Sequence, residues 1–259
     1  MIIVRKLVLG LLFFVLAGGV LPVLAQNTQY TDYQFQEDKY RKSYATYQLF
    51  LKDYLSDPSL NNEQNAIQAA REAIKYREST LSHYFWWQAE TLKATKLDLP
   101  LVHQTISDLD TLGKYHYSQS QDSQDIDTKT SLTRFTKANR KQTHDYDINA
   151  IKAQVVLKLT RLIQFQTDLK RGYDFLIRSL PDQDTNLVIK NGLEQISTNA
   201  TAANTLIEKL TTQIKDLDLS EKRESQFYEK SIETMTQIKN LQSRSIDIII
   251  ELDTSYVAR

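Results

Sequence analysis

Hydrophobic residues recur along much of this chain at alternating intervals of three and four, a spacing that lines them up on one side of an α-helix. The most regular stripe has nine members: Ile189, Leu193, Ile196, Ala200, Ala203, Ile207, Leu210, Ile214 and Leu217. Such a period predicts a helix that packs against its neighbours as helices do in coiled coils. The same register then meets Glu221 and Glu224, so the stripe ends before them.

Few residues interrupt the helical pattern, and the prolines mark where it turns. After residue 25 the chain contains only Pro58, Pro100 and Pro181, and the segments between them predict long helices. These helices cover about 28–56, 59–96, 100–117, 131–179, 183–217 and 220–256. The sequence also allows the last two to form one continuous helix with a local phase shift. The expected fold is therefore all-α, an elongated antiparallel helical bundle of about six helices with coiled-coil-like packing.

The first 25 residues have the features of an export signal. Two basic residues precede an uncharged run from Leu7 to Ala25, which ends in the small-x-small pattern that signal peptidase recognises. The run is also long enough to remain as an N-terminal membrane anchor. With either outcome, the basic residues before the run predict that the rest of the chain lies outside the cytoplasm. It would then be secreted, periplasmic or held at the cell surface.

A polar stretch near the middle of the chain suggests how the chain is divided. Residues 118–128 read SQSQDSQDIDT and nearly lack apolar side chains, which is typical of a linker or a surface loop. We therefore expect four parts: a signal peptide or N-terminal anchor at 1–25, an aromatic-rich helical hairpin region at 26–117, a polar linker at 118–130 and a long antiparallel helical bundle at 131–259.

The composition argues against most kinds of chemistry. The chain has no cysteine, which excludes disulfides and thiolate sites, and its four histidines form neither an H-E-x-x-H motif nor an i, i+4 pair. It also lacks a glycine-rich phosphate loop and a G-x-S-x-G elbow. With 32 Lys and Arg against 32 Asp and Glu, nothing marks a binder of nucleic acid or of an anionic membrane. The sequence thus predicts no catalytic, metal-binding or cofactor-binding residue, and we expect that the protein is not an enzyme.

Tyrosines are concentrated near the N-terminus. Eight of the 14 fall between Tyr30 and Tyr84, and six of these form most of the stripe of the first helix. Tyrosine suits the edge of a bundle, where the ring packs and the hydroxyl stays in water, and it is also enriched in binding surfaces. Both interpretations agree with the pattern. On the second interpretation, the candidate partner-binding residues of this helix are Tyr33, Tyr40, Tyr44 and Tyr47.

The segment HYFWW at 83–87 places aromatic rings around most of the second helix. Three of the four rings from 84 to 87 fall in or beside two apolar stripes of that helix. Trp86 instead points into a charged face that includes Glu78, Glu90 and Lys93. Either another helix covers Trp86, or its ring is an exposed contact that adjoins the tyrosine-rich first helix. Trp86 therefore completes the set of candidate partner-binding residues.

These features predict a secreted or cell-surface helical scaffold that binds a protein or an envelope component without catalysis. We expect no nucleic-acid partner, and contact with a membrane only through an uncleaved N-terminal segment. The alternative is an extracytoplasmic bundle that binds a small ligand or acts as a sensor. A sensor that signals inward needs a second membrane span, and the C-terminal SIDIIIELDTSYVAR is too short and too charged for one. A ligand binder needs a pocket between helices that is lined by tyrosine and tryptophan.

Overall fold

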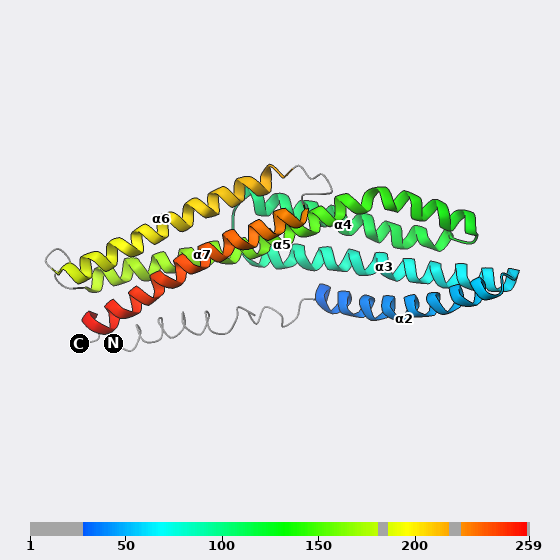
Figure 1. The fold of residues 1–259 in the computed structure, drawn as a ribbon, viewed down its shortest axis with the longest axis horizontal. Coiled ribbons are helices and arrows are strands. Elements are labelled where there is room, and N and C mark those ends of the chain that lie inside the picture. Colours follow the sequence, from blue (N-terminus) through cyan, green and yellow to red (C-terminus); the bar gives the residue numbers. More distant parts are fainter. Residues whose placement is uncertain (1–27, 181–185, 218–223, 258–259) are drawn as a thin grey trace. The chain divides into compact units, whose positions relative to one another are not determined.

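The structure is a computed structural model that describes residues 28–180, 186–217 and 224–257. Every regular element in these ranges is helical, so the all-α prediction is confirmed. The elements are α2 (Thr28–Ser56), α3 (Leu60–Ala94), α4 (Pro100–Asp122), η2 (Ser123–Asp125), α5 (Lys129–Ser179), α6 (Leu187–Lys215), α7 (Glu224–Leu252) and η3 (Asp253–Val257) (Figure 1). The expected export signal at 1–25 lies outside the described residues. None of the helices described is both long and apolar enough to cross a membrane.

Several helix ends follow directly from the residues at those positions. Ser59 caps α3, where its side chain accepts a hydrogen bond from the backbone N–H of Asn62. Pro100 begins α4, and its missing N–H is no loss there because the first turn of a helix cannot pair that group internally. Asn186 caps α6 in the same way as Ser59 caps α3. Local capping chemistry therefore sets the start of three helices.

The segment 118–130, expected to be a polar linker, is mostly helical. The helix α4 continues through it to Asp122, and α5 begins at Lys129. Ser120 is buried and donates to the backbone carbonyl of Lys75 on α3 at 3.0 Å. A serine hydroxyl can satisfy its hydrogen bond on a nearby backbone carbonyl, which allows a short polar residue to enter a contact between helices. Polar composition alone therefore did not indicate a loop here.

Contacts between the helices divide the described chain into two compact units, at a point within α5 between Gln154 and Val155. The N-terminal unit contains α2, α3, α4, η2 and α5 up to Gln154. The C-terminal unit contains the remainder of α5 together with α6, α7 and η3. The candidate boundary at 118–130 falls inside the N-terminal unit.

The core of the N-terminal unit lies between α3 and α4. Its buried apolar residues include Phe85, Ala89, Leu92, Leu101, Val102 and Leu109. The helix α5 joins this pair through hydrogen bonds: the Tyr115 hydroxyl donates to the Asn139 side-chain carbonyl, and the Gln154 amide donates to the Tyr84 hydroxyl, each at 2.9 Å. The helix α2 packs on α3 but has no buried residue. The helix α2 therefore packs on α3 through side chains that remain partly exposed.

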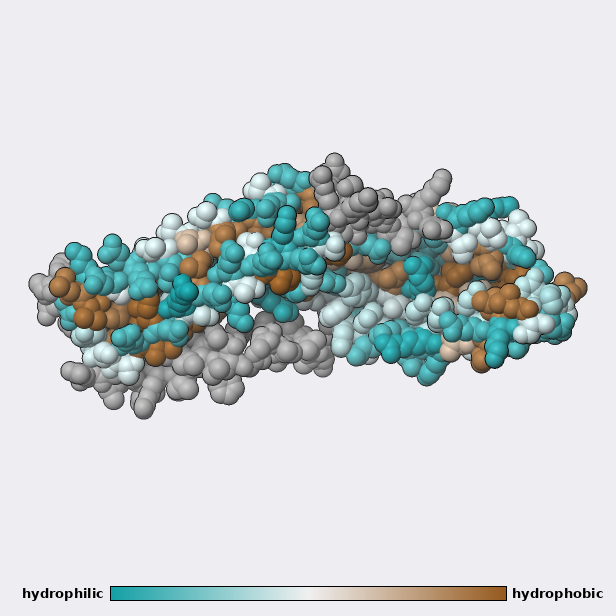
Figure 2. Space-filling view, in the orientation of Figure 1, coloured by the Kyte–Doolittle hydropathy of each residue, from teal (hydrophilic) through white to brown (hydrophobic). Residues whose placement is uncertain are grey.

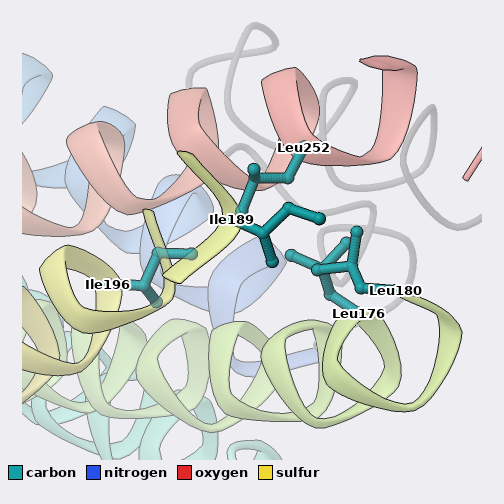
Figure 3. Close-up of a cluster of buried hydrophobic side chains, with 5 residues drawn as sticks. All are labelled: Leu176, Leu180, Ile189, Ile196 and Leu252. Atoms are coloured by element: carbon teal, nitrogen blue, oxygen red, sulfur yellow. The ribbon is translucent and has the colours of Figure 1, made fainter. Parts of the chain in front are cut away.

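The core of the C-terminal unit is built on the stripe of α6. Five of its nine members are buried, namely Ile189, Ile196, Ala203, Leu210 and Ile214. At one end they meet Leu176 and Leu180 of α5 and Leu252 of α7, which point toward the same centre (Figure 3). The helix α6 ends at Lys215 and α7 begins at Glu224 and runs back along it, so the prediction of two separate helices is confirmed (Figure 1).

Candidate binding surface on α2 and α3

The helices α2 and α3 form an antiparallel hairpin (Figure 1). At one end the Tyr30 ring lies 5.0 Å from the Trp87 ring. At the other end the Tyr54 hydroxyl donates to the Glu63 carboxylate at 3.4 Å. The two contacts are separated by the same number of residues along each helix, so the register of the two helices is constant between them.

This register places tyrosines of α2 opposite alanines of α3. Between the two end contacts, Tyr44 and Tyr47 come opposite Ala73 and Ala70. The alanines of this face are buried, namely Ala66, Ala69, Ala70 and Ala73. A large ring against a small side chain fills the space between helices, and a tyrosine hydroxyl can remain in water at the edge. Edge packing therefore accounts for the tyrosines of α2, and their part in binding a partner stays a prediction.

Four rings form a cluster at the start of α2, which we call the aromatic cluster: Tyr30, Tyr33, Tyr84 and Trp87. Tyr33 and Trp87 stack with centroids 5.9 Å apart and 13° between their planes. The side-chain amide of Gln154 on α5 donates a hydrogen bond to the Tyr84 hydroxyl. Burial raises the pKa of the Tyr33 hydroxyl above its usual value, and the Glu37 carboxylate raises it further. The rings are thus fixed by three helices, and the Tyr33 hydroxyl stays protonated.

The rim of the aromatic cluster carries a histidine. The ring nitrogen Nδ1 of His83 donates to the Gln29 side-chain carbonyl at 3.1 Å. Burial lowers the pKa of His83 below its usual value, while the charge of Asp32 acts in the opposite direction. The lowered pKa favours the neutral imidazole near pH 7. The groups at this cluster are therefore aromatic rings and side-chain amides, and the neutral imidazole adds no positive charge.

The four candidate tyrosines of α2 lie on the face toward α3, but in two groups. Tyr33 belongs to the aromatic cluster. Tyr40, Tyr44 and Tyr47 form a row, with ring centroids 5.8 and 6.2 Å apart. Tyr44 is the most open of the row, with 43 % of its surface exposed. The structure therefore brings the predicted tyrosines onto one helix face, with Tyr44 the most accessible of the row.

Trp86 is separate from these tyrosines because α4 covers it. A Cβ atom at Gly113 of α4 would lie 2.3 Å from the indole Nε1, so the ring rests directly on that glycine. The Tyr117 ring of α4 lies 6.0 Å away on the same side. The expectation that Trp86 adjoins the first helix is therefore wrong, and Trp87 holds that place. The alternative, a further helix over the ring, is confirmed, and a role of the partly exposed Trp86 in binding stays a prediction.

Gly113→Ala should displace Trp86, because the added methyl group would occupy the space of the indole. We expect a loss of about 1–3 kcal/mol in the free energy of unfolding, together with a red shift of Trp86 fluorescence measured in a Trp87→Phe background. Gly172→Ala on α5 is the matched control, since a Cβ there meets nothing within 4 Å. It should instead stabilise the helix by up to about 1 kcal/mol. A neutral Gly113→Ala with unshifted fluorescence would contradict the packing.

A glutamate and a histidine form a buried hydrogen-bonded pair between α3 and α4. Nδ1 of His116 donates to Oε2 of Glu78 at 2.6 Å, and Nη1 of Arg77 donates to Oε1 of the same carboxylate at 2.7 Å. Only 1 % of Glu78 and 3 % of His116 are exposed. The Phe85 ring stacks on the imidazole with centroids 5.4 Å apart. The pair is therefore enclosed by the core, where it can join two helices but cannot reach a substrate.

The described residues hold no group of three His, Asp or Glu side chains placed to bind a metal ion. The side chain of His144 lies outside the described part. Comparison of the chain with family models, with curated proteins and with solved structures returned no match. The fold and this surface define the class of the protein as all-α, with a tyrosine-rich helix packed on α3 in the N-terminal unit.

Proposed function

We propose that this chain is an extracytoplasmic helical scaffold that binds another macromolecule, a protein or an envelope component, without catalysis. The supporting observation is the exposed apolar surface on α2 and at the turn after it. Of the nine large hydrophobic side chains that are exposed in the described residues, five fall in this region: Phe35, Tyr44, Leu49, Leu55 and Leu60. Figure 2 shows hydrophobic side chains at the end of the hairpin where α2 and α3 meet.

The outer face of α2 explains why a partner would gain from covering it. Phe35 is 57 % exposed and Leu49 is 65 % exposed. Phe35 follows Tyr33 by two residues, about 200° around the helix, so it points away from α3. Full burial of one such side chain contributes about 1.5–3 kcal/mol. Phe35 and Leu49 lie 14 residues apart on this outer face, so a partner that runs along α2 would cover both.

A photoreactive amino acid at Leu49 tests the proposal in cells of the native host. We expect one dominant crosslinked partner from this position, because the side chain faces outward from α2. The same probe at Thr205 on α6, which is also exposed, is the control and should give no such adduct. Equal adducts from both positions, or none from Leu49, would contradict the proposal.

Leu49→Ser separates binding from folding in the same assay. Because Leu49 is exposed, the substitution should change the free energy of unfolding by no more than about 0.5 kcal/mol. It should nevertheless reduce crosslinking from a probe placed at Phe35, on the same outer face. Undiminished crosslinking would show that this face does not contact the partner.

A further inference from the structure

The first part of α5 carries a concentration of positive charge that the neutral overall composition hides. Residues 129–141 contain five basic side chains and no acidic one: Lys129, Arg134, Lys137, Arg140 and Lys141. The nearest acidic residues in the sequence are Asp127 before the run and Asp145 after it. The net charge of the whole chain of 259 residues is zero and therefore does not reveal this basic segment.

Three of these basic side chains form an exposed surface that we call the basic face: Lys129, Arg134 and Lys137. None of the three forms an ion pair with another described residue. The Lys129 ammonium lies 5.8 Å from the centre of the Tyr54 ring, a contact that leaves its charge uncompensated. The basic face is therefore positively charged and open to solvent.

The opposite side of the same helix is used for packing. Leu132 and Phe135 are partly buried, and Asn139 accepts the hydrogen bond from Tyr115 of α4. Lys137 follows Phe135 by two residues and points about 160° away from it. The helix thus divides into a packed side and a charged side. On the charged side, the one contact given above with another helix is that of Lys129 with the Tyr54 ring.

We infer that the basic face binds the anionic headgroups of a phospholipid bilayer. Each Lys or Arg close to an anionic membrane surface strengthens binding roughly fivefold. The three residues of the basic face therefore give weak and reversible attachment that salt screens. In the described part of α5, no large hydrophobic side chain before Phe175 is strongly exposed, so the contact is with headgroups and involves no insertion.

Two observations favour a bilayer over other anionic partners. Proteins that bind single-stranded nucleic acid place aromatic rings among the basic residues to stack on bases, and the exposed residues between Lys129 and Lys137 include threonines but no aromatic ring. A flat, fluid surface neutralises separate charges without the shape match that an acidic protein requires. The inference is independent of the proposed partner of α2, because it concerns another helix.

Vesicle binding of the full chain, isolated from its own host, tests the inference. Neutral phosphatidylcholine vesicles are compared with vesicles that contain about 30 % phosphatidylglycerol, at low and at high salt. An N-terminal anchor, if it is retained, binds both kinds alike, so the readout is the difference between them. We expect at least about tenfold stronger binding to the anionic vesicles at low salt, and no preference at high salt.

Charge reversal supplies the specific evidence. Arg134→Glu with Lys137→Glu should remove the preference for anionic vesicles by about tenfold or more. Lys190→Glu with Lys209→Glu on α6 is the control, since both lysines are exposed and the change in net charge is the same. The control should keep the preference. Equal losses in the two variants, or no preference in the unaltered chain, would overturn the inference. Binding to RNA or polyphosphate without binding to vesicles would also overturn it, in favour of a soluble polyanion.

Discussion

Leu210→Asp should unfold the C-terminal unit. Leu210 is fully buried in the last two turns of α6, so the substitution removes a leucine that fills the core, at a cost of about 2–5 kcal/mol. A carboxylate buried without a partner adds several kcal/mol more. The total approaches or exceeds the roughly 5–15 kcal/mol by which a domain is stable. Urea denaturation followed by circular dichroism measures the loss, and hydrogen exchange should assign it to the amides of α6.

Thr205→Asp is the matched control on the same helix. Thr205 is exposed, and its hydroxyl makes only a local hydrogen bond to the carbonyl of Thr201. The substitution should therefore change the free energy of unfolding by less than about 1 kcal/mol. If the two variants unfold at the same urea concentration, Leu210 is not in the core and the stripe of α6 does not face its neighbours.

The existence of this stripe could be predicted from the sequence because one period covers all of α6. The burial of each member of the stripe could not be predicted. Members seven residues apart are fully buried, namely Ile189, Ile196, Ala203 and Leu210, whereas Leu193, Ala200 and Ile207 between them are only partly buried. The difference depends on the side from which α5 and α7 approach, and the residues of α6 alone carry no information about that direction.

The aromatic residues of the N-terminal unit also show what helical periodicity can and cannot predict. Helical periodicity places each ring of HYFWW at an angle around α3, and Trp87 lies against α2 as a second apolar stripe suggests. What covers Trp86 is decided by Gly113 on another helix. A glycine inside a helix costs stability relative to alanine. Its presence there was therefore the available signal that a large ring packs on the backbone of α4.

The positions of charged residues also depend on neighbouring helices. Glu78 was placed by periodicity in a charged face, but it lies in the core with a histidine from α4. The equal numbers of basic and acidic residues in the whole chain conceal the basic face of α5. A count over a single helix finds the basic face, whereas nothing local to α3 identifies the partner of Glu78.

Glu78→Ala should destabilise the N-terminal unit by about 3–5 kcal/mol in the free energy of unfolding. The reason is that the buried His116 Nδ1 loses its acceptor inside the core. Glu90→Ala on the same helix is the control, because Glu90 is exposed and pairs with Lys93 at the surface. That change should cost less than about 1 kcal/mol. Equal costs for the two variants would show that burial adds nothing to the Glu78 interaction.

A double-mutant cycle with Glu78→Leu and His116→Leu tests whether the two side chains act as a pair. Each single substitution leaves one polar partner in the core without the other, and should cost several kcal/mol. The double substitution removes both polar groups and fills the space with apolar atoms, so it should cost at least about 1 kcal/mol less than the sum of the single changes. Denaturation of the four proteins gives this coupling directly. Additive costs would mean that Glu78 and His116 contribute independently, and that the 2.6 Å contact does not hold α3 to α4.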